Sequence, residues 1–193
     1  MQEILITGGS RGIGKAIAEY FSDYKIIALS SKDGDLRDEE FRNHLINTYD
    51  PEVFINNAGI ISDNITEILD VNTTAAIHLL DGFYNKMKTG HIINIGSMRT
   101  QSNGFHLKQM NRVHYSISKK SLREASHFYS DLNLNPVKVT LLDIGTVDTT
   151  IDNKQIDNPM KPQNIAEVID YILNLPSHMS IRTMEIPNAC GKN

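Results

Sequence analysis

Apolar residues along this chain follow two spacings that alternate from the N-terminus to the C-terminus. Short continuous apolar runs are typical of strands covered on both faces, and repeats of three and four residues are typical of helices. A chain that alternates the two in this way predicts a parallel sheet with helices on both faces. The predicted strands are residues 4–6, 25–29, 53–59, 91–97, 137–142 and 182–186, and the predicted helices are residues 13–21, 39–49, 65–88, 113–132 and 162–175.

The predicted fold class is therefore α/β, a doubly wound, Rossmann-type parallel sheet. The segment 33–38, DGDLRD, follows the second strand after only three residues. That distance leaves no room for the helix that normally separates a second and a third strand, so the layout is predicted to be abbreviated there. The 193 residues suffice for one good hydrophobic core, and no linker or repeat divides them. We therefore predict one domain over residues 1–193.

The first strand runs into a glycine-rich turn, TGGSRGIG, at residues 7–14. Gly8, Gly12 and Gly14 suit a turn with unusual backbone angles, a backbone close to a ligand and a helix close to its strand. Free N–H groups at the start of such a helix attract phosphate. The spacing differs from GxGxxG, so on this stretch alone an ordinary βα turn stays an alternative.

Polar residues also follow later strands, at the edge where open α/β sheets bind ligands. The third strand runs into NNAG at residues 56–59, and the fourth ends at Ser97. Tyr115 and Lys119 are four residues apart and therefore share one helix face. Asn72 lies on the apolar stripe of its helix. A buried amide must be hydrogen-bonded, so Asn72 is either a satisfied structural amide or part of a polar site.

Composition narrows the function classes. A net charge of −4 and a pI near 5.9 argue against a nucleic-acid surface. One cysteine, Cys190, excludes an internal disulfide and a multi-cysteine zinc site, and the histidines form no metal-ligand pattern, so no metal is predicted. No apolar run is long enough to span a bilayer and no signal-peptide stretch precedes the first strand. We expect a cytoplasmic protein without a membrane partner.

The four motifs, in this order, resemble the short-chain dehydrogenase/reductase family over residues 3–186. The resemblance implies an NADP(H)-dependent enzyme that transfers hydride between nicotinamide and a small carbonyl or alcohol substrate. It assigns Tyr115 as general acid/base, with the positive charge of Lys119 favouring the phenolate. Lys119 would also bind the nicotinamide ribose, Ser97 would hydrogen-bond the substrate oxygen, and Asn72 would complete the proton relay.

The resemblance also implies a cofactor site. Ser30 stands where an acidic residue would hold the ribose 2′-hydroxyl, so with Arg11 and Lys32 it favours NADP over NAD. Asp33 and Asp35 oppose this preference, NAD stays possible, and a merely solvated loop is the alternative. The implied cofactor-binding residues are Gly8, Ser10, Arg11, Gly12, Ile13, Gly14, Ser30, Ser31, Lys32, Asp35, Leu36, Asn57, Ala58, Gly59, Tyr115, Lys119, Val147 and Thr149.

Two departures from the family pattern bear on the substrate. Ile144 replaces a proline before Gly145, and the interval between Ser97 and Tyr115 is long. The extra residues form either a substrate-specific loop or a surface insertion. A homodimer or homotetramer is expected, because helices 65–88 and 113–132 form a shared bundle in similar proteins.

Two other functions stay open at this stage. The chain could be a non-catalytic NADP(H)-binding regulatory or partner-binding module on the same fold, because fold does not fix function. A nucleotide-sugar epimerase is disfavoured by length, since this chain has no room for the additional substrate domain of that branch.

Overall fold

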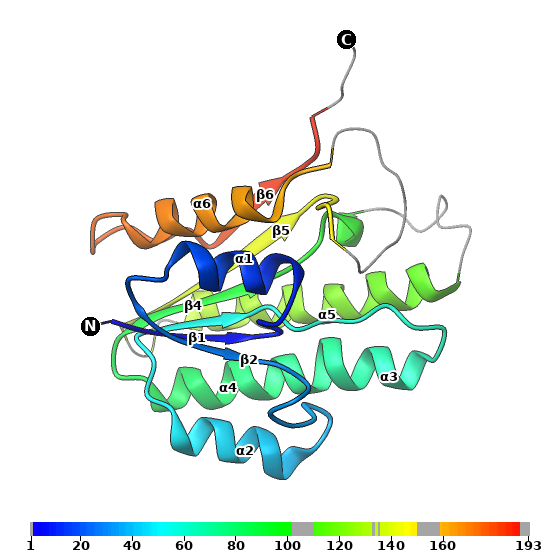
Figure 1. Cartoon of the computed structure of the whole chain (residues 1–193), viewed down its shortest axis with the longest axis horizontal. Coiled ribbons are helices and arrows are strands. Elements are labelled where there is room, and N and C mark those ends of the chain that lie inside the picture. The colour runs from blue at the N-terminus through cyan, green and yellow to red at the C-terminus, as the bar shows by residue number, and fades with distance from the viewer. Residues whose placement is uncertain (1, 102–109, 133, 135, 150–158, 190–193) are drawn as a thin grey trace.

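The computed structural model describes residues 2–101, 110–132, 134, 136–149 and 159–189 (Figure 1). These residues form a parallel sheet of six strands in the order β2-β1-β3-β4-β5-β6. The alternation of apolar runs with helical repeats thus gives the predicted doubly wound sheet. The strands are β1 (Glu3–Thr7), β2 (Lys25–Leu29), β3 (Val53–Asn56), β4 (Gly90–Ile95), β5 (Val137–Ile144) and β6 (Thr183–Ile186).

Helices cover both faces of the sheet, as Figure 1 shows. Two helices pack together on one face, and the others lie on the opposite face. The first face carries α1 (Gly12–Tyr20) and α6 (Pro162–Leu173). The second carries α2 (Glu39–Thr48), α3 (Ile65–Leu69), the π-helical segment η1 (Asp70–Ala75), α4 (Ala76–Lys86) and α5 (Met110–Leu132), and a short 3₁₀ turn, η2 (Met98–Gln101), follows β4.

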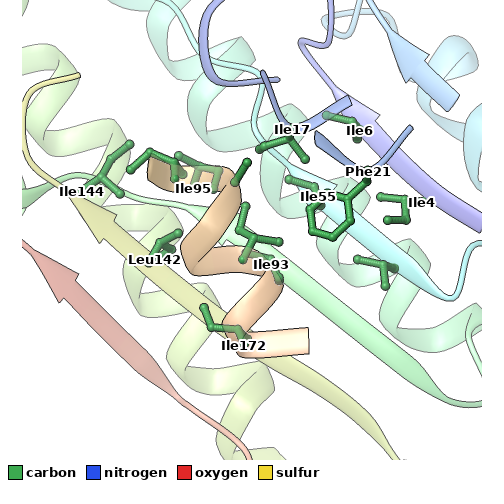
Figure 2. Close-up of a cluster of buried hydrophobic side chains, with 14 residues drawn as sticks. Ile4, Ile6, Ile17, Phe21, Ile55, Ile93, Ile95, Leu142, Ile144 and Ile172 are labelled. Atoms are coloured by element: carbon green, nitrogen blue, oxygen red, sulfur yellow. The ribbon is translucent and has the colours of Figure 1, made fainter. Parts of the chain in front are cut away.

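Alternate residues of each strand supply the two hydrophobic cores. Ile4 and Ile6 of β1 pack beneath α1 and α6, where Ile17 and Phe21 meet them (Figure 2). Leu5 points to the other face and packs with residues of α4. All three β1 side chains are fully buried, and each such side chain stabilises the fold by roughly 1.5–3 kcal/mol. This packing holds the strands rigid up to their carboxyl ends.

The abbreviated region is residues 30–38, which form turns and no helix, as predicted. Asp33 folds back onto Ser30, Arg37 pairs with Asp35, and the side chain of Asp38 caps α2 by accepting the N–H of Glu40. The chain then enters α2 and crosses to β3 on the other side of β1. Because residues 30–38 form no strand that could pair with β2, β2 is the edge strand of the sheet. The assignment of residues 1–193 to one domain stays a prediction.

Candidate active site

A cavity of about 1130 Å³ follows the carboxyl edge of the sheet. A residue directly after each strand lines it, from Gly8 after β1 to Pro187 after β6. This is the edge at which open α/β sheets bind ligands. The cavity wall includes most of the predicted residues, namely Gly8, Ser10, Arg11, Gly12, Ile13, Ser30, Ser31, Asp35, Leu36, Asn57, Ala58, Gly59, Ser97, Tyr115, Lys119, Val147 and Thr149.

Three predicted residues do not lie on this wall. Lys32 is exposed, and its backbone N–H donates to Ser30 Oγ at 3.2 Å, so it supports the turn. Asn72 is fully buried. Gly14 allows close packing, because a Cβ atom at this position would overlap the Gly8 carbonyl oxygen and lie 2.7 Å from Asn57 Nδ2. Gly14 is therefore needed for the close packing of α1 against the glycine-rich turn.

The loops after β1 and β3 are bonded together at the point where the strand order reverses. Thr7 Oγ1 accepts the backbone N–H groups of Asn57 and Ala58, both at 3.1 Å, and Asn57 Nδ2 donates to the Thr7 carbonyl at 2.9 Å. Gly8 has φ +69°, and a Cβ atom there would come within 3.0 Å of the Ala58 Cα atom. Only glycine leaves this space open without backbone strain.

The N-terminus of α1 opens into the same cavity. Within the fully described segment 7–20, Arg11 at the N-cap makes no side-chain capping bond, and the first turn of α1 carries no acidic residue. The first N–H groups of the helix and its positive dipole end are thus available to an anion. A narrow glycine turn beside such a helix start fits the pyrophosphate of a dinucleotide. The residues present therefore suit NAD(P).

Two carboxylates stand near the end of β2. The N–H and the hydroxyl of Ser30 both donate to Asp33 Oδ2, at 2.8 and 2.9 Å, and these bonds lower the pKa of Asp33. Asp35 lines the cavity, but Arg37 binds it through Nε and Nη2, and this pairing lowers the pKa of Asp35. Both groups are ionised at neutral pH, and the charge of Asp35 is compensated by its partner.

Asn72 lies in the π-helical segment η1, a type of bulge that is frequent at functional sites. Its Oδ1 accepts the N–H of Ile60 at 2.8 Å, and its Nδ2 donates to the Ile60 carbonyl at 2.9 Å and to Ser118 Oγ at 3.2 Å. Both amide hydrogens are therefore used. Of the two possibilities left open by the sequence, the side chain is a satisfied structural amide that holds the loop after NNAG.

Lys119 is 3% exposed, and its Nζ donates to the carbonyl of Ile95 at 2.8 Å. A Cβ atom on Gly59 would lie 3.4 Å from Nζ and also 3.4 Å from Asn72 Oδ1, so the NNAG turn lies close to both of these side chains. Burial lowers the pKa of Lys119 to about 8, against the opposing effect of Asp143. At neutral pH this ammonium is still mainly protonated.

Ser97 and Tyr115 come to the cavity from β4 and α5. The N–H of Ser97 donates to Asp143 Oδ1 at 2.8 Å, and Ser97 Oγ accepts the N–H of Arg99 at 3.3 Å. Ser116 Oγ donates to the Arg99 carbonyl at 3.0 Å and so ties η2 to α5 next to Tyr115. The serine, the phenol and the ammonium thus share one wall.

The segment after β5 is held by a side chain that the sequence analysis missed. Asn188 Oδ1 accepts the N–H of Thr146 at 2.6 Å, and its Nδ2 donates to the Thr146 carbonyl at 2.8 Å. This paired amide braces the loop where Ile144 replaces the family's proline. Asn188 follows β6 at the carboxyl edge, so the strand-end argument used for Ser97 would have identified it.

Other residues also line the cavity, including Met98, Arg99 and Thr146 from the two segments around the predicted substrate pocket. The further lining residues are Leu29, Gly34, Arg37, Phe41, Ile60, Ile61, Glu67, Val71, Ile95, Gly96, Met98, Arg99, Ile144, Gly145, Thr146, Pro187 and Asn188. Residues 102–109, within the long interval before Tyr115, and residues 150–158 lie outside the described residues.

Two other features are absent from the part of the chain that the structure describes. Among the described residues, no cluster of three or more His, Cys, Asp or Glu side chains is placed to hold a metal ion, and no helix is long and apolar enough to cross a membrane.

Residues 30–159 match the family model described as short chain dehydrogenase, which covers more than half of the chain. The chain therefore belongs to the short-chain dehydrogenase family, and the resemblance found in the sequence is confirmed. An uncharacterised oxidoreductase of Staphylococcus aureus (strain MW2) is 29% identical over 155 residues, 70% of this chain and 63% of that protein. The chain thus spans less than two thirds of that relative.

The match to this chain covers most of a second relative and of two solved structures. An uncharacterised oxidoreductase of Staphylococcus epidermidis (strain ATCC 35984) is 26% identical over 223 aligned positions, 94% of this chain and 95% of that protein. The 3-alpha-hydroxysteroid dehydrogenase of Pseudomonas sp. B-0831, complexed with NADH, has a TM-score of 0.82 at 16% identity and 96% and 94% coverage. A short chain dehydrogenase of Burkholderia cenocepacia J2315, in complex with NADP, has a TM-score of 0.79 at 20% identity and 97% and 96% coverage. These structures share the fold.

Proposed function

We propose that this protein is an NADP(H)-dependent oxidoreductase that interconverts a small carbonyl compound and its alcohol. One observation carries the proposal: Ser97, Tyr115 and Lys119 line the same cavity as the glycine-rich turn after β1. A dinucleotide whose phosphates lie at the start of α1 can extend along the strand ends toward this polar group. When bound, the cofactor supplies or accepts the hydride.

The side chains divide the remaining work. Tyr115 gives its phenol proton to the carbonyl oxygen, or removes it from the alcohol in the reverse direction. The ammonium of Lys119 favours the ionised phenol through its positive charge. Ser97 donates a hydrogen bond to the substrate oxygen, where negative charge develops. The side chain of Asn72 holds the loop at Ile60, so a role of Asn72 in a proton relay would have to use its backbone.

A preference for NADP over NAD is part of the proposal. Arg11 lines the cavity at the helix start, where its guanidinium can bind a 2′-phosphate in a bidentate manner. Arg37 also lines the cavity and compensates Asp35. The carboxylate of Asp33, bonded to Ser30, is the group that limits this preference. The exposed ammonium of Lys32, at the same turn, adds a second and more mobile positive charge.

Turnover tests the proposal directly. The protein is incubated with NADPH and a panel of aldehydes, ketones and 3-ketoacyl thioesters, and the loss of absorbance at the nicotinamide band is followed. Substrate-dependent oxidation that is lost in Tyr115→Phe supports an enzyme. Tight NADPH binding without turnover on any carbonyl compound would instead indicate the non-catalytic binding module. A cytoplasmic location remains a prediction from the sequence.

A further inference from the structure

A carboxylate that the resemblance does not assign lies directly behind the serine of the site. Asp143 of β5 is 0% exposed, and its Oδ1 accepts the N–H of Ser97 at 2.8 Å. One residue earlier, the N–H of Gly96 donates to the backbone carbonyl of Leu142 at 2.9 Å. The side chain of Asp143 thus continues the β4–β5 ladder by one hydrogen bond after the backbone pairing ends.

The residue before Ser97 is adapted to this carboxylate. A Cβ atom on Gly96 would overlap Asp143 Oδ1, and it would lie 2.9 Å from Leu141 Cδ1. Any side chain at this position would push the carboxylate away from the Ser97 N–H. The close approach of Asp143 to β4 therefore depends on glycine at position 96, and the two residues form one unit.

The carboxylate of Asp143 belongs to a small network of charged side chains. Arg123 of α5 binds Asp143 Oδ2 through Nη1 and Glu185 of β6 through Nη2, the latter at 3.1 Å. Burial raises the pKa of Asp143, and Arg123 opposes that shift. Asp143 in turn opposes the effect of burial on the pKa of Lys119. A buried charge without such partners costs several kcal/mol, so the three groups depend on one another.

We propose that Asp143 is a positioning residue of the active site, which fixes the backbone of Ser97 through a hydrogen bond and stabilises the buried Lys119 ammonium through its charge. Arg123 opposes the effect of burial on the pKa of this carboxylate and so favours its charged form. The catalytic meaning of this arrangement rests on the proposed function. The arrangement itself concerns the protonation of Lys119, which can be measured without substrate.

The test separates the charge from the hydrogen bond. Asp143→Asn keeps an acceptor oxygen for the Ser97 N–H and removes the charge. The double variant Asp143→Asn/Arg123→Met also removes the guanidinium that would otherwise lose its partner, so it serves if the single variant folds poorly. Asp131→Asn is the matched control. Asp131 of α5 also pairs with an arginine, Arg182, but its side chain is 60% exposed.

The first readout is the titration of the Lys119 side-chain nitrogen by NMR on ¹⁵N-lysine-labelled protein. We expect its midpoint to fall by about one pH unit in Asp143→Asn or in the double variant, and to stay unchanged in Asp131→Asn. The second readout is kcat/KM for carbonyl reduction. The kcat/KM of the wild type divided by that of Asp143→Asn should rise about fivefold between pH 6.5 and 8.5. The reason is that the Lys119 ammonium of the variant loses its proton at a lower pH than that of the wild type.

The two readouts fail in different ways. An unchanged Lys119 midpoint in both Asp143 variants overturns the inference, whatever the activity. A lowered midpoint in a protein whose wild type reduces no carbonyl compound supports the electrostatic role of Asp143 and rejects the proposed function. A lowered midpoint together with the pH-dependent loss of kcat/KM supports both.

Discussion

Asn72 and Ile60 form a reciprocal pair: the Asn72 side chain accepts the Ile60 N–H at 2.8 Å and donates to the Ile60 carbonyl at 2.9 Å. The pair mimics the hydrogen bonding of two adjacent strands, but one partner is an amide side chain. It fixes the loop that follows NNAG against the helix that contains Asn72. Because Gly59 lies close to both Asn72 and Lys119, the pair also holds the NNAG turn beside the lysine of the site.

We expect Asn72→Ala to lower the free energy of unfolding by about 2–4 kcal/mol, because it leaves the partly buried N–H and carbonyl of Ile60 without these partners. The affinity for NADPH should weaken as the loop loosens. Urea unfolding and NADPH titration measure the two effects. Asn85→Ala is the control, since Asn85 bonds Asp81 on the exposed side of α4. A variant with unchanged stability and reduced kcat would favour a relay role for the side chain.

Tyr115→Phe should nearly abolish turnover and leave the Kd for NADPH largely intact. The change keeps the ring and removes only the transferable proton, so the loss falls on the chemical step. Lys119→Ala should weaken both turnover and NADPH binding. Tyr171→Phe, at a 59% exposed tyrosine of α6, is the control and should be fully active. If Tyr115→Phe kept more than about a tenth of the wild-type rate, a barrier increase below ~1.4 kcal/mol, Tyr115 would not be the acid.

The sequence predicted the elements well because their signals are local. Continuous apolar runs and helical repeats locate every strand and most helix ends, and the strand-end rule locates Ser97 and the NNAG turn. Asn56, the first residue of that turn, joins β3 to β4, since its Nδ2 donates to Asn94 Oδ1 at 2.9 Å.

What the sequence could not supply is pairing between distant positions. Asp143 looks like an ordinary strand residue until the register of β4 and β5 places it beside Ser97. Periodicity also could not show that the Asn72 side-chain amide forms all its hydrogen bonds within the protein, because hydrogen-bond partners are set by tertiary packing. Such contacts depend on loops whose course is not encoded in a local pattern.

We expect a ten- to hundredfold preference for NADP over NAD. Each exposed charged contact to the 2′-phosphate contributes about 1 kcal/mol, and a few such contacts give a preference of this size. Arg11→Ala should reduce NADP affinity, and Asp33→Asn should increase the preference because it removes the carboxylate bonded to Ser30. Ser30→Asp should shift use toward NAD. The measurement is kcat/KM or Kd for both cofactors at one ionic strength.

Lys15→Ala provides the control for that series. Lys15 is also a cation of α1, but its exposed ammonium pairs with Glu19 at 3.5 Å. Its removal should change the affinity for either cofactor very little. Equal or better use of NAD by the wild type, or unchanged NADP affinity in Arg11→Ala, would mean that the residues after β2 are only a solvated loop.

We expect a homodimer or homotetramer in solution. Ile117 and Phe128 of α5 are 48% and 59% exposed, large apolar side chains on the helix that the family resemblance places in a shared bundle. Ile117→Glu/Phe128→Glu should reduce the particle toward the mass of one 21.7 kDa chain. Light scattering at micromolar concentration measures this. Tyr171→Glu, on the opposite face of the sheet, should keep a mass above the monomer, and a monomeric wild type would contradict the prediction.

The last prediction concerns acid stability and His91 of β4. This side chain is 7% exposed, and its Nε2 lies 2.8 Å from Thr140 Oγ1. The Thr140 hydroxyl donates to the carbonyl of Ile181, so Nε2 of the imidazole is the donor to Thr140. Burial, together with the charge of Lys138, lowers the pKa of His91 to about 4 from an ordinary value of 6.5.

Because the unfolded chain binds this proton more readily than the folded one, the contribution of neutral His91 is full above pH 6.5 and is lost as the pH falls toward 4. The wild type should therefore lose about 2 kcal/mol of unfolding free energy from this group between pH 7.5 and 5. His91→Gln keeps a donor for Thr140 but does not titrate. Urea unfolding of both proteins at the two pH values cancels the contributions of all other groups, and equal losses in the two would show that His91 is not the residue that titrates.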